Sequence, residues 1–90
     1  MNELTDLEFR IIDELYFVTS FSDLTYALAE GQSSLTEGLR TLLEKELITQ
    51  LVFEQELKDY RKLEKPDFDT LEHSYFVASR KGLLIHNSRL

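Results

Sequence analysis

Residues 32–48 read QSSLTEGLRTLLEKELI, and this stretch decides the fold. Its leucines recur at the spacing of one helix face, which predicts an amphipathic helix over residues 34–47. Ser34 and Glu37 fit a capping box at its start, because each side chain can satisfy a free backbone amide of the first turn. Ile48 and the residues after it favour a strand. The stretch therefore predicts a helix that leads directly into a strand. Its buried stripe is Leu35, Leu39, Leu42 and Leu43.

Two further helices are expected before residue 32. Thr5 and Glu8 fit a capping box for a helix over residues 5–19. Ser22 is a suitable N-cap for a shorter helix over residues 23–30, and Gly31 fits the position just after its end. Three helices joined by short turns predict a helix-turn-helix unit. The inward positions are Leu4, Leu7, Ile11, Leu15 and Val18 in the first helix, and Leu24, Ala27 and Leu28 in the second.

Residues 48–79 have the pattern of an antiparallel hairpin. Leu51, Phe53 and Leu57 alternate with polar residues, as in a half-buried strand. The charged residues 58–72, which include the chain's one proline, predict a long loop or hairpin tip. Residues 74–78 (SYFVA) predict a second strand, and Ser79 is placed to cap a short helical turn over residues 80–86.

Composition limits the chain to one small domain over residues 1–90. No apolar run is long enough to span a bilayer and no signal peptide is visible, so a soluble, cytoplasmic protein is expected. There is no cysteine, which excludes disulfides. The formal charge of −7 opposes non-specific attraction to nucleic acid or to an anionic membrane.

The order helix, helix, helix, strand, loop, strand resembles the winged helix-turn-helix superfamily. Residues 5–15 and 33–48 are similar to the first and recognition helices of bacterial regulators, and residues 75–84 (YFVASRKGLL) are similar to the end of the wing in MarR- and PadR-like proteins. The resemblance implies an α+β fold: a three-helix winged helix-turn-helix with a two- or three-stranded antiparallel wing. Glu46 departs from it, because many members have a glycine there that tolerates a left-handed backbone.

The resemblance also implies DNA contact by the exposed side of the third helix and by the basic residues of the wing. Arg40 is suited to a guanine edge, but Glu37 and Glu44 lie one turn away and would compete for its guanidinium. The wing's bases are outnumbered by acids, which favours a solvated, self-paired hairpin. The DNA-contact candidates are Ser33, Ser34, Thr36, Arg40, Thr41, Lys58, Arg61, Lys62 and Lys65.

A second apolar stripe on the first helix allows two interpretations. It consists of Phe9, Ile12 and Tyr16, with Phe17 and Phe21 nearby. These residues either complete the core or form an interface with a second copy or a protein partner. The sequence leaves both open.

Catalysis, metal binding and cofactor binding are not expected. Asp67, Asp69 and Glu72 lack the ligand number and turn glycine of a calcium loop. His73 and His86 match no zinc spacing and are expected at the surface or at strand ends. No set of nucleophile, base and orienting group stands out.

Two hypotheses for function remain. The first is a small DNA-binding module that resembles a bacterial transcriptional regulator and acts as a dimer on double-stranded DNA. The second is a winged-helix protein–protein interaction module with no DNA binding, which would pair through its first helix or its wing edge. The sequence favours the first by resemblance, since overall acidity does not forbid a local basic site.

Overall fold

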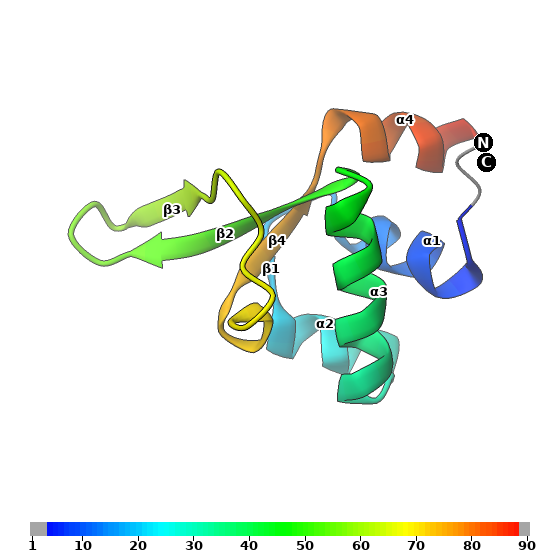
Figure 1. Ribbon diagram of the computed structural model, residues 1–90, viewed down its shortest axis with the longest axis horizontal. Coiled ribbons are helices and arrows are strands. Elements are labelled where there is room, and N and C mark those ends of the chain that lie inside the picture. The colour runs from blue at the N-terminus through cyan, green and yellow to red at the C-terminus, as the bar shows by residue number, and fades with distance from the viewer. Residues whose placement is uncertain (1–3, 89–90) are drawn as a thin grey trace.

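The fold is mixed α+β, with helices packed against one face of an antiparallel sheet (Figure 1). A computed structural model describes residues 4–88. The helices in this part are α1 (Asp6–Glu14), α2 (Phe21–Leu28), α3 (Gln32–Glu44) and α4 (Arg80–Ser88), with a 3₁₀ turn, η1 (Leu71–His73). The strands are β1 (Thr19–Ser20), β2 (Ile48–Glu54), β3 (Asp59–Lys62) and β4 (Tyr75–Ala78).

The sheet has the strand order β1-β4-β2-β3, and every neighbouring pair is antiparallel. Phe76 of β4 lies between Thr19 of β1 and Gln50 of β2. Beyond this, β2 and β3 form a hairpin in which Phe53 is opposite Tyr60. The hairpin projects away from the helices (Figure 1), so its outer part contributes little to the core.

The core lies between α1, α3 and the inner face of the sheet. The predicted stripe of α3 is buried as expected, and Ile11, Leu15 and Phe76 are fully buried with it. Helices α1 and α3 approach closely at Gly38, where a Cβ would lie 2.9 Å from Ile11 Cδ1 and would displace the end of that side chain. Burial of each large apolar side chain contributes roughly 1.5–3 kcal/mol. The α3 stripe is therefore a large part of what holds the domain together.

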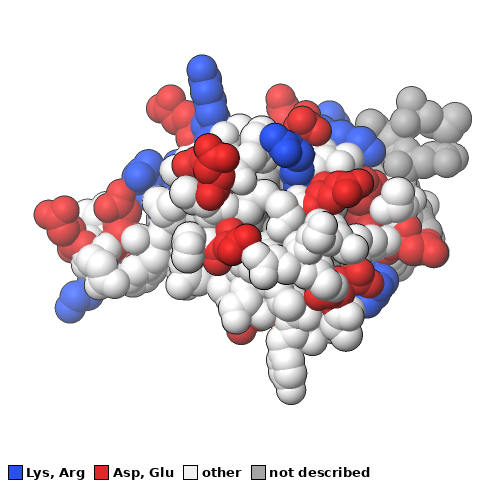
Figure 2. Space-filling view, turned by 60° about the horizontal axis from the view of Figure 1, so that its bottom comes forward, with Lys and Arg blue, Asp and Glu red and all other residues white. Residues whose placement is uncertain are grey.

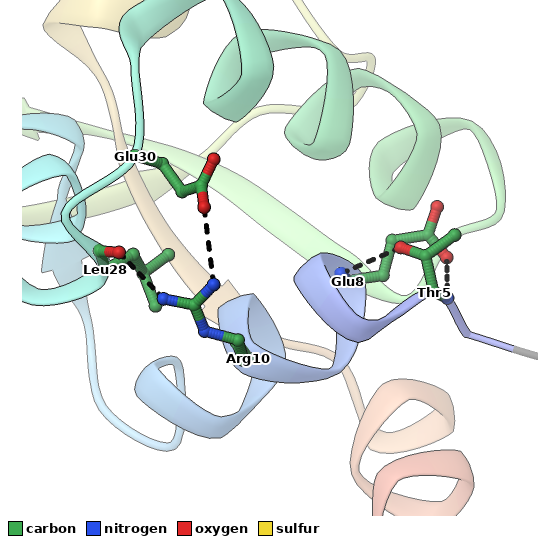
Figure 3. A network of polar contacts seen from close by, with 5 residues as sticks. All are labelled: Thr5, Glu8, Arg10, Leu28 and Glu30. Atoms are coloured by element: carbon green, nitrogen blue, oxygen red, sulfur yellow. Dashed lines mark hydrogen bonds and ion pairs between the residues drawn. The ribbon is translucent and has the colours of Figure 1, made fainter.

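Helix α1 begins as predicted and ends five residues earlier. The Thr5–Glu8 capping box is present, with Glu8 N donating to Thr5 Oγ1 at 3.0 Å (Figure 3). The prediction that this helix continues to residue 19 is wrong. The Thr19 hydroxyl donates to Glu14 O at 3.2 Å and so satisfies a carbonyl at the helix end, while Thr19 itself joins β1. Val18 therefore lies outside the helix and is exposed.

Helix α2 begins two residues earlier than predicted. Its N-cap is Ser20 rather than Ser22, with Asp23 N donating to Ser20 Oγ at 3.0 Å. This start places Phe21 inside the helix and buried, whereas Ala27 faces solvent instead of the core. The helix ends at Leu28, and its C-cap Ala29 has a left-handed φ of 53°, in the role that was expected of Gly31.

Arg10 fastens α1 to the end of α2. Its guanidinium donates to Leu28 O at 2.7 Å and to Glu30 Oε2 at 3.3 Å (Figure 3). Since Leu28 O is one of the carbonyls left free at the end of α2, Arg10 caps that helix from a neighbouring element.

Helix α3 also begins two residues early, and the capping box predicted at Ser34 and Glu37 is not formed. Gly31 is the N-cap, in an extended conformation with φ −65°, and makes no side-chain cap. Ser34 lies inside the first turn as a result. The helix ends at Glu44, before the predicted residue 47.

The charged residues 58–72 were predicted to form a long loop or hairpin tip, but part of this stretch is a strand. Residues 59–62 form β3, because they pair with residues 51–54 of β2 around a tight tip. Leu57 lies in that tip and is exposed rather than half-buried in a strand. The hairpin of β2 and β3 is thus one half of a four-stranded antiparallel sheet, in which β4 pairs with the other side of β2 and β1 forms the far edge.

Helix α4 is longer than the predicted turn and is capped by Ser79, as expected, with Gly82 N donating to Ser79 Oγ at 3.0 Å. It packs across the junction between α3 and β2. A Cβ on Gly82 would lie 2.0 Å from Leu47 O, so only glycine allows this approach. In the part of the chain that the structure describes, no helix has both the length and the apolar character needed to cross a bilayer.

Candidate interaction surfaces on helix α3 and on the hairpin

The exposed side of α3 forms one wall of a shallow groove. Ser33, Thr36, Glu37 and Arg40 lie along it, and Glu72 of η1 lines it from the other side. The groove has a volume of about 490 Å³ and is open to solvent. It therefore brings two carboxylates and one guanidinium together with two hydroxyl groups.

Arg40 is held differently from the prediction. Its Cζ lies 4.6 Å from the centre of the Phe68 ring, a cation–π arrangement. Within residues 4–88, Arg40 forms no ion pair within 4.0 Å, so the expected capture by Glu37 or Glu44 does not occur. The ring fixes the guanidinium while leaving its donors available.

Phe68 reaches Arg40 because Gln50 anchors the loop before η1. Gln50 is buried in β2, and its amide Nε2 donates to Asp67 O at 3.0 Å and to Ser74 Oγ at 2.8 Å. Its Oε1 accepts from Asp67 N at 2.8 Å. The sequence interpretation missed this residue. The alternation of Leu51 and Phe53 with polar residues placed Gln50 on the exposed face of the strand, whereas the structure buries Gln50 and leaves Phe53 39% exposed.

The other hydroxyl candidates do not lie in the α3 groove. Ser34 and Thr41 face a separate depression of about 240 Å³ between α1 and α3, together with Thr5 and Glu8. The Thr41 hydroxyl donates to Glu37 O at 3.1 Å, which occupies it within its own helix. The structure thus divides the predicted α3 contacts, and Ser33, Thr36 and Arg40 remain as one group.

The basic wing residues lie apart from that group. Lys62 lines a depression at the opposite end of α3, beside Glu46. Lys58 lies at the hairpin tip with φ 52°, and Lys65 is exposed in the loop after β3. Arg61 forms an ion pair with Glu54, the one part of the predicted self-pairing that the described residues show. Acidic and basic side chains alternate over this part of the surface, without a continuous basic area (Figure 2).

The second stripe of α1 is covered by α4 more than it is exposed. Ile12 and Phe21 belong to the core, and Phe9 stacks on His86 with ring centres 4.2 Å apart. Tyr16 is half-exposed, and its hydroxyl donates to Asn87 Oδ1 at 2.7 Å. Of this set, Phe17 is the residue that is largely free, at 83% exposed.

His86 was expected at the surface or at a strand end, but it lies in α4 and is buried, with only 1% of it exposed. Its Nδ1 lies 2.9 Å from the Tyr16 hydroxyl and its Nε2 lies 3.1 Å from Asp13 Oδ1. The second contact has ion-pair distance but not good hydrogen-bond geometry. His86 is therefore a packing residue of the α1–α4 contact.

An aromatic row on the outer face of the sheet was not predicted. Phe53 and Tyr60 are cross-strand partners with ring centres 5.3 Å apart, and Tyr60 and Tyr75 are 4.9 Å apart. These edge-to-face contacts are the arrangement that aromatic quadrupoles favour. Phe53 is 39% exposed and Tyr60 41% exposed, so this row, Phe53–Tyr60–Tyr75, is a partly apolar surface on the hairpin.

Among residues 4–88, no group of three or more His, Asp or Glu side chains is placed to hold a metal ion. Comparison of the chain with protein-family models, with curated proteins and with solved structures finds no match.

Proposed function

We propose that this chain is a winged-helix domain that binds another protein, and that the α3 groove receives a basic segment of that partner. The winged-helix assignment is supported by the resemblance of residues 5–15, 33–48 and 75–84 and by an antiparallel hairpin directly after α3. The choice of partner rests on the chemistry of the groove.

The observation that carries the proposal is the presence of Glu37 and Glu72 on the two walls of the groove around Arg40. A phosphate that approaches Arg40 must pass both carboxylates. Like charges repel, so each carboxylate opposes the approach of a phosphate. The net charge of −7 acts in the same direction at longer range.

The same carboxylates suit a lysine or arginine side chain of a polypeptide. Ser33 and Thr36 add hydroxyl groups that can donate to or accept from a peptide backbone. Arg40, fixed over Phe68, offers donors to a partner carbonyl. An open, polar groove of this kind fits a weak, charge-selective contact better than a deep ligand pocket does.

The test uses a labelled peptide of alternating lysine and glycine, with the contact mapped by amide chemical shifts. We expect the shifts to concentrate on α3 and η1 and to weaken as salt is raised, since exposed charges are screened. A Glu37→Lys/Glu72→Lys variant should lose the binding.

The matched control is Glu14→Lys/Glu56→Lys, which changes the net charge equally at two exposed residues outside the groove. It should bind the peptide with little loss. Equal loss in both double variants would show that the peptide responds to overall charge, and the groove proposal would be wrong.

A DNA-binding module resembling a bacterial regulator is the second candidate. It is favoured by the absence of an ion pair on Arg40, Lys58, Lys62 and Lys65 within the described residues, which leaves these cations available. A labelled random duplex at low salt separates the two candidates by fluorescence anisotropy. A domain that contacts several phosphates binds at roughly 10⁻⁴–10⁻⁶ M, with steep salt dependence. The protein-contact proposal expects no such binding. Duplex binding that Arg40→Ala weakens would favour DNA instead.

A further inference from the structure

We infer that the free edge of β3 is a contact between two copies of this chain, in which the two β3 strands pair antiparallel about a twofold axis at Tyr60. This contact uses a different surface from the α3 groove and does not depend on the proposed function. It is carried by the direction of the edge groups, by charge complementarity and by the aromatic row.

The β3 edge has backbone groups that point away from the sheet. Strand β3 is last in the strand order, and each of its residues is exposed. Leu63 N donates to Gln50 O at 3.0 Å, which marks a hydrogen-bonded pair of the β2–β3 ladder. Because such pairs alternate along an antiparallel ladder, the N–H and C=O of Tyr60 and Lys62 point outward.

The outward Tyr60 N–H confirms this direction. It donates to the Asp59 carboxylate at 2.7 Å, a side chain of its own strand, and no other strand reaches it within residues 4–88. An exposed edge of this kind is a template for pairing with another strand.

The same geometry selects one register. Directly opposite residues of an antiparallel pair have their side chains on the same face of the sheet. When the two strands are identical, the twofold axis must therefore pass between one β3 residue and the same residue of the second copy. An axis at Arg61 would place two Arg61 side chains opposite each other. An axis at Tyr60 places Asp59 opposite Arg61 of the second copy, and this attractive pair occurs twice. Opposite charges in directly facing positions stabilise a pair of strands, whereas like charges destabilise it.

The groups released on pairing gain new partners: the Asp59 carboxylate exchanges the Tyr60 N–H for Arg61 of the second copy, and Tyr60 N–H donates to Tyr60 O of that copy. Arg61 keeps its Nε on Glu54 and has its other guanidinium N–H groups for Asp59. The paired region ends at Asp59, because Lys58 has a left-handed backbone at the hairpin turn. Because the paired region ends at Asp59, Lys58 does not lie directly opposite Lys62 of the second copy, which carries the same charge.

The aromatic row continues across the axis. Tyr60 lies on the same sheet face as Phe53 and Tyr75, and its ring contacts both. Pairing at Tyr60 brings the two rows side by side on one continuous face and covers part of the exposed Phe53 and Tyr60 rings. Because one twofold contact uses the β3 edge of both copies, and the other sheet edge, β1, has only two residues, assembly stops at the dimer.

The experiment is sedimentation equilibrium of the full chain over a range of concentrations, with circular dichroism to confirm folding. We expect reversible dimerisation of the wild type. Asp59→Arg turns two attractive pairs into two repulsive ones and should lower the association constant roughly tenfold. Asp59→Arg/Arg61→Asp restores opposite charges and should recover most of the association.

A backbone variant tests the pairing independently of charge. Tyr60→Pro removes one outward N–H and leaves the inward ladder bonds of β3 in place, so it should abolish association in a folded protein. Its control, Tyr60→Val, keeps the N–H and should retain weaker association. A monomeric wild type, an Asp59→Arg variant that associates as well as the wild type, or a folded Tyr60→Pro dimer would each overturn the inference. All of these substitutions lie outside the α3 groove. A failure of the dimer inference would therefore leave the peptide-binding proposal untouched, and the reverse also holds.

Discussion

At the scale of single residues, the backbone conformation of Glu46 determines how α3, β2 and α4 meet. It has φ 62°, in the left-handed region. In this conformation Glu46 N donates to Leu43 O at 3.0 Å and Leu47 N donates to Leu42 O at 2.9 Å, the two bonds of a Schellman motif. The Ser79 hydroxyl donates to Glu46 O at 2.8 Å and so connects this turn to α4. The left-handed Glu46 is therefore kept in place by hydrogen bonds at the end of α3 and by the Ser79 hydroxyl.

We predict that Glu46→Gly stabilises the protein. Glycine adopts the left-handed conformation without the steric cost that a Cβ imposes, although it gains more freedom on unfolding. The net gain in the free energy of unfolding should be roughly 0.5–1 kcal/mol. Urea denaturation measures it, and Ala29→Gly, at the other left-handed helix end, should behave alike. A loss of stability in both variants would contradict the steric argument.

A substitution at Gly82 should lower the free energy of unfolding, the opposite of the effect expected at Glu46. In Gly82→Ala the new Cβ would meet Leu47 O, a backbone atom that cannot move aside without opening the α3–β2 turn. We expect a loss of about 3 kcal/mol or more, at the upper end of overpacking costs. Gly31→Ser is the control, since no atom lies within 4 Å of a Cβ there and serine is a good N-cap. Thermal unfolding followed by circular dichroism should separate the two variants clearly.

At the scale of elements, the loop between β3 and η1 depends on Gln50. Gln50→Leu keeps the size of the side chain but removes three hydrogen bonds to Asp67 and Ser74. We expect a loss of roughly 2–3 kcal/mol, because buried groups of the loop lose their partners. Nuclear Overhauser contacts between Phe68 and Arg40 should weaken at the same time. Thr49→Val, on the other face of β2, should leave those contacts intact.

The elements also show which parts of the fold the sequence could predict. The stripe of α3 and the Thr5 and Ser79 caps follow from spacing and local chemistry, and all three are present. The starts of α2 and α3 were each predicted two residues too late. In α2, Ser20 competes with Ser22 as the N-cap, and burial of Phe21 favours Ser20. In α3, Gly31 takes the N-cap position that was predicted for Ser34, further along the chain.

Features that depend on distant residues could not be predicted. Strand β3 is stable because it pairs with β2, although its residues are all exposed and charged or aromatic. The position of Arg40 required Phe68, which reaches it only through Gln50. Helical spacing alone placed Arg40 between two glutamates, since it contains no information about a loop more than twenty residues away.

At the scale of the whole molecule, the charge of −7 is confined to a body with a radius of gyration of 12.3 Å. Such an excess of like charge destabilises the folded state through self-repulsion. We predict that the midpoint of thermal unfolding rises by a few degrees when sodium chloride is raised from low to physiological concentration, which shortens the Debye length to about 8 Å.

Scanning calorimetry checks this effect. The Glu37→Lys/Glu72→Lys variant carries −3, because each substitution adds two charges to −7, and it should show a smaller rise with salt. A midpoint that falls with salt would mean that attractive ion pairs outweigh the net repulsion.

The position of β4 and α4 has a consequence for folding during synthesis. Strand β4 lies between β1 and β2, and α4 covers Phe9 through its stack with His86. A ribosome delivers the chain from its N-terminus, so the first three helices emerge before either element that covers them. Until residues 75–88 are released, β1 has no partner strand and one apolar side of α1 faces water. Release of residues 75–88 therefore converts a set of helices into a closed domain.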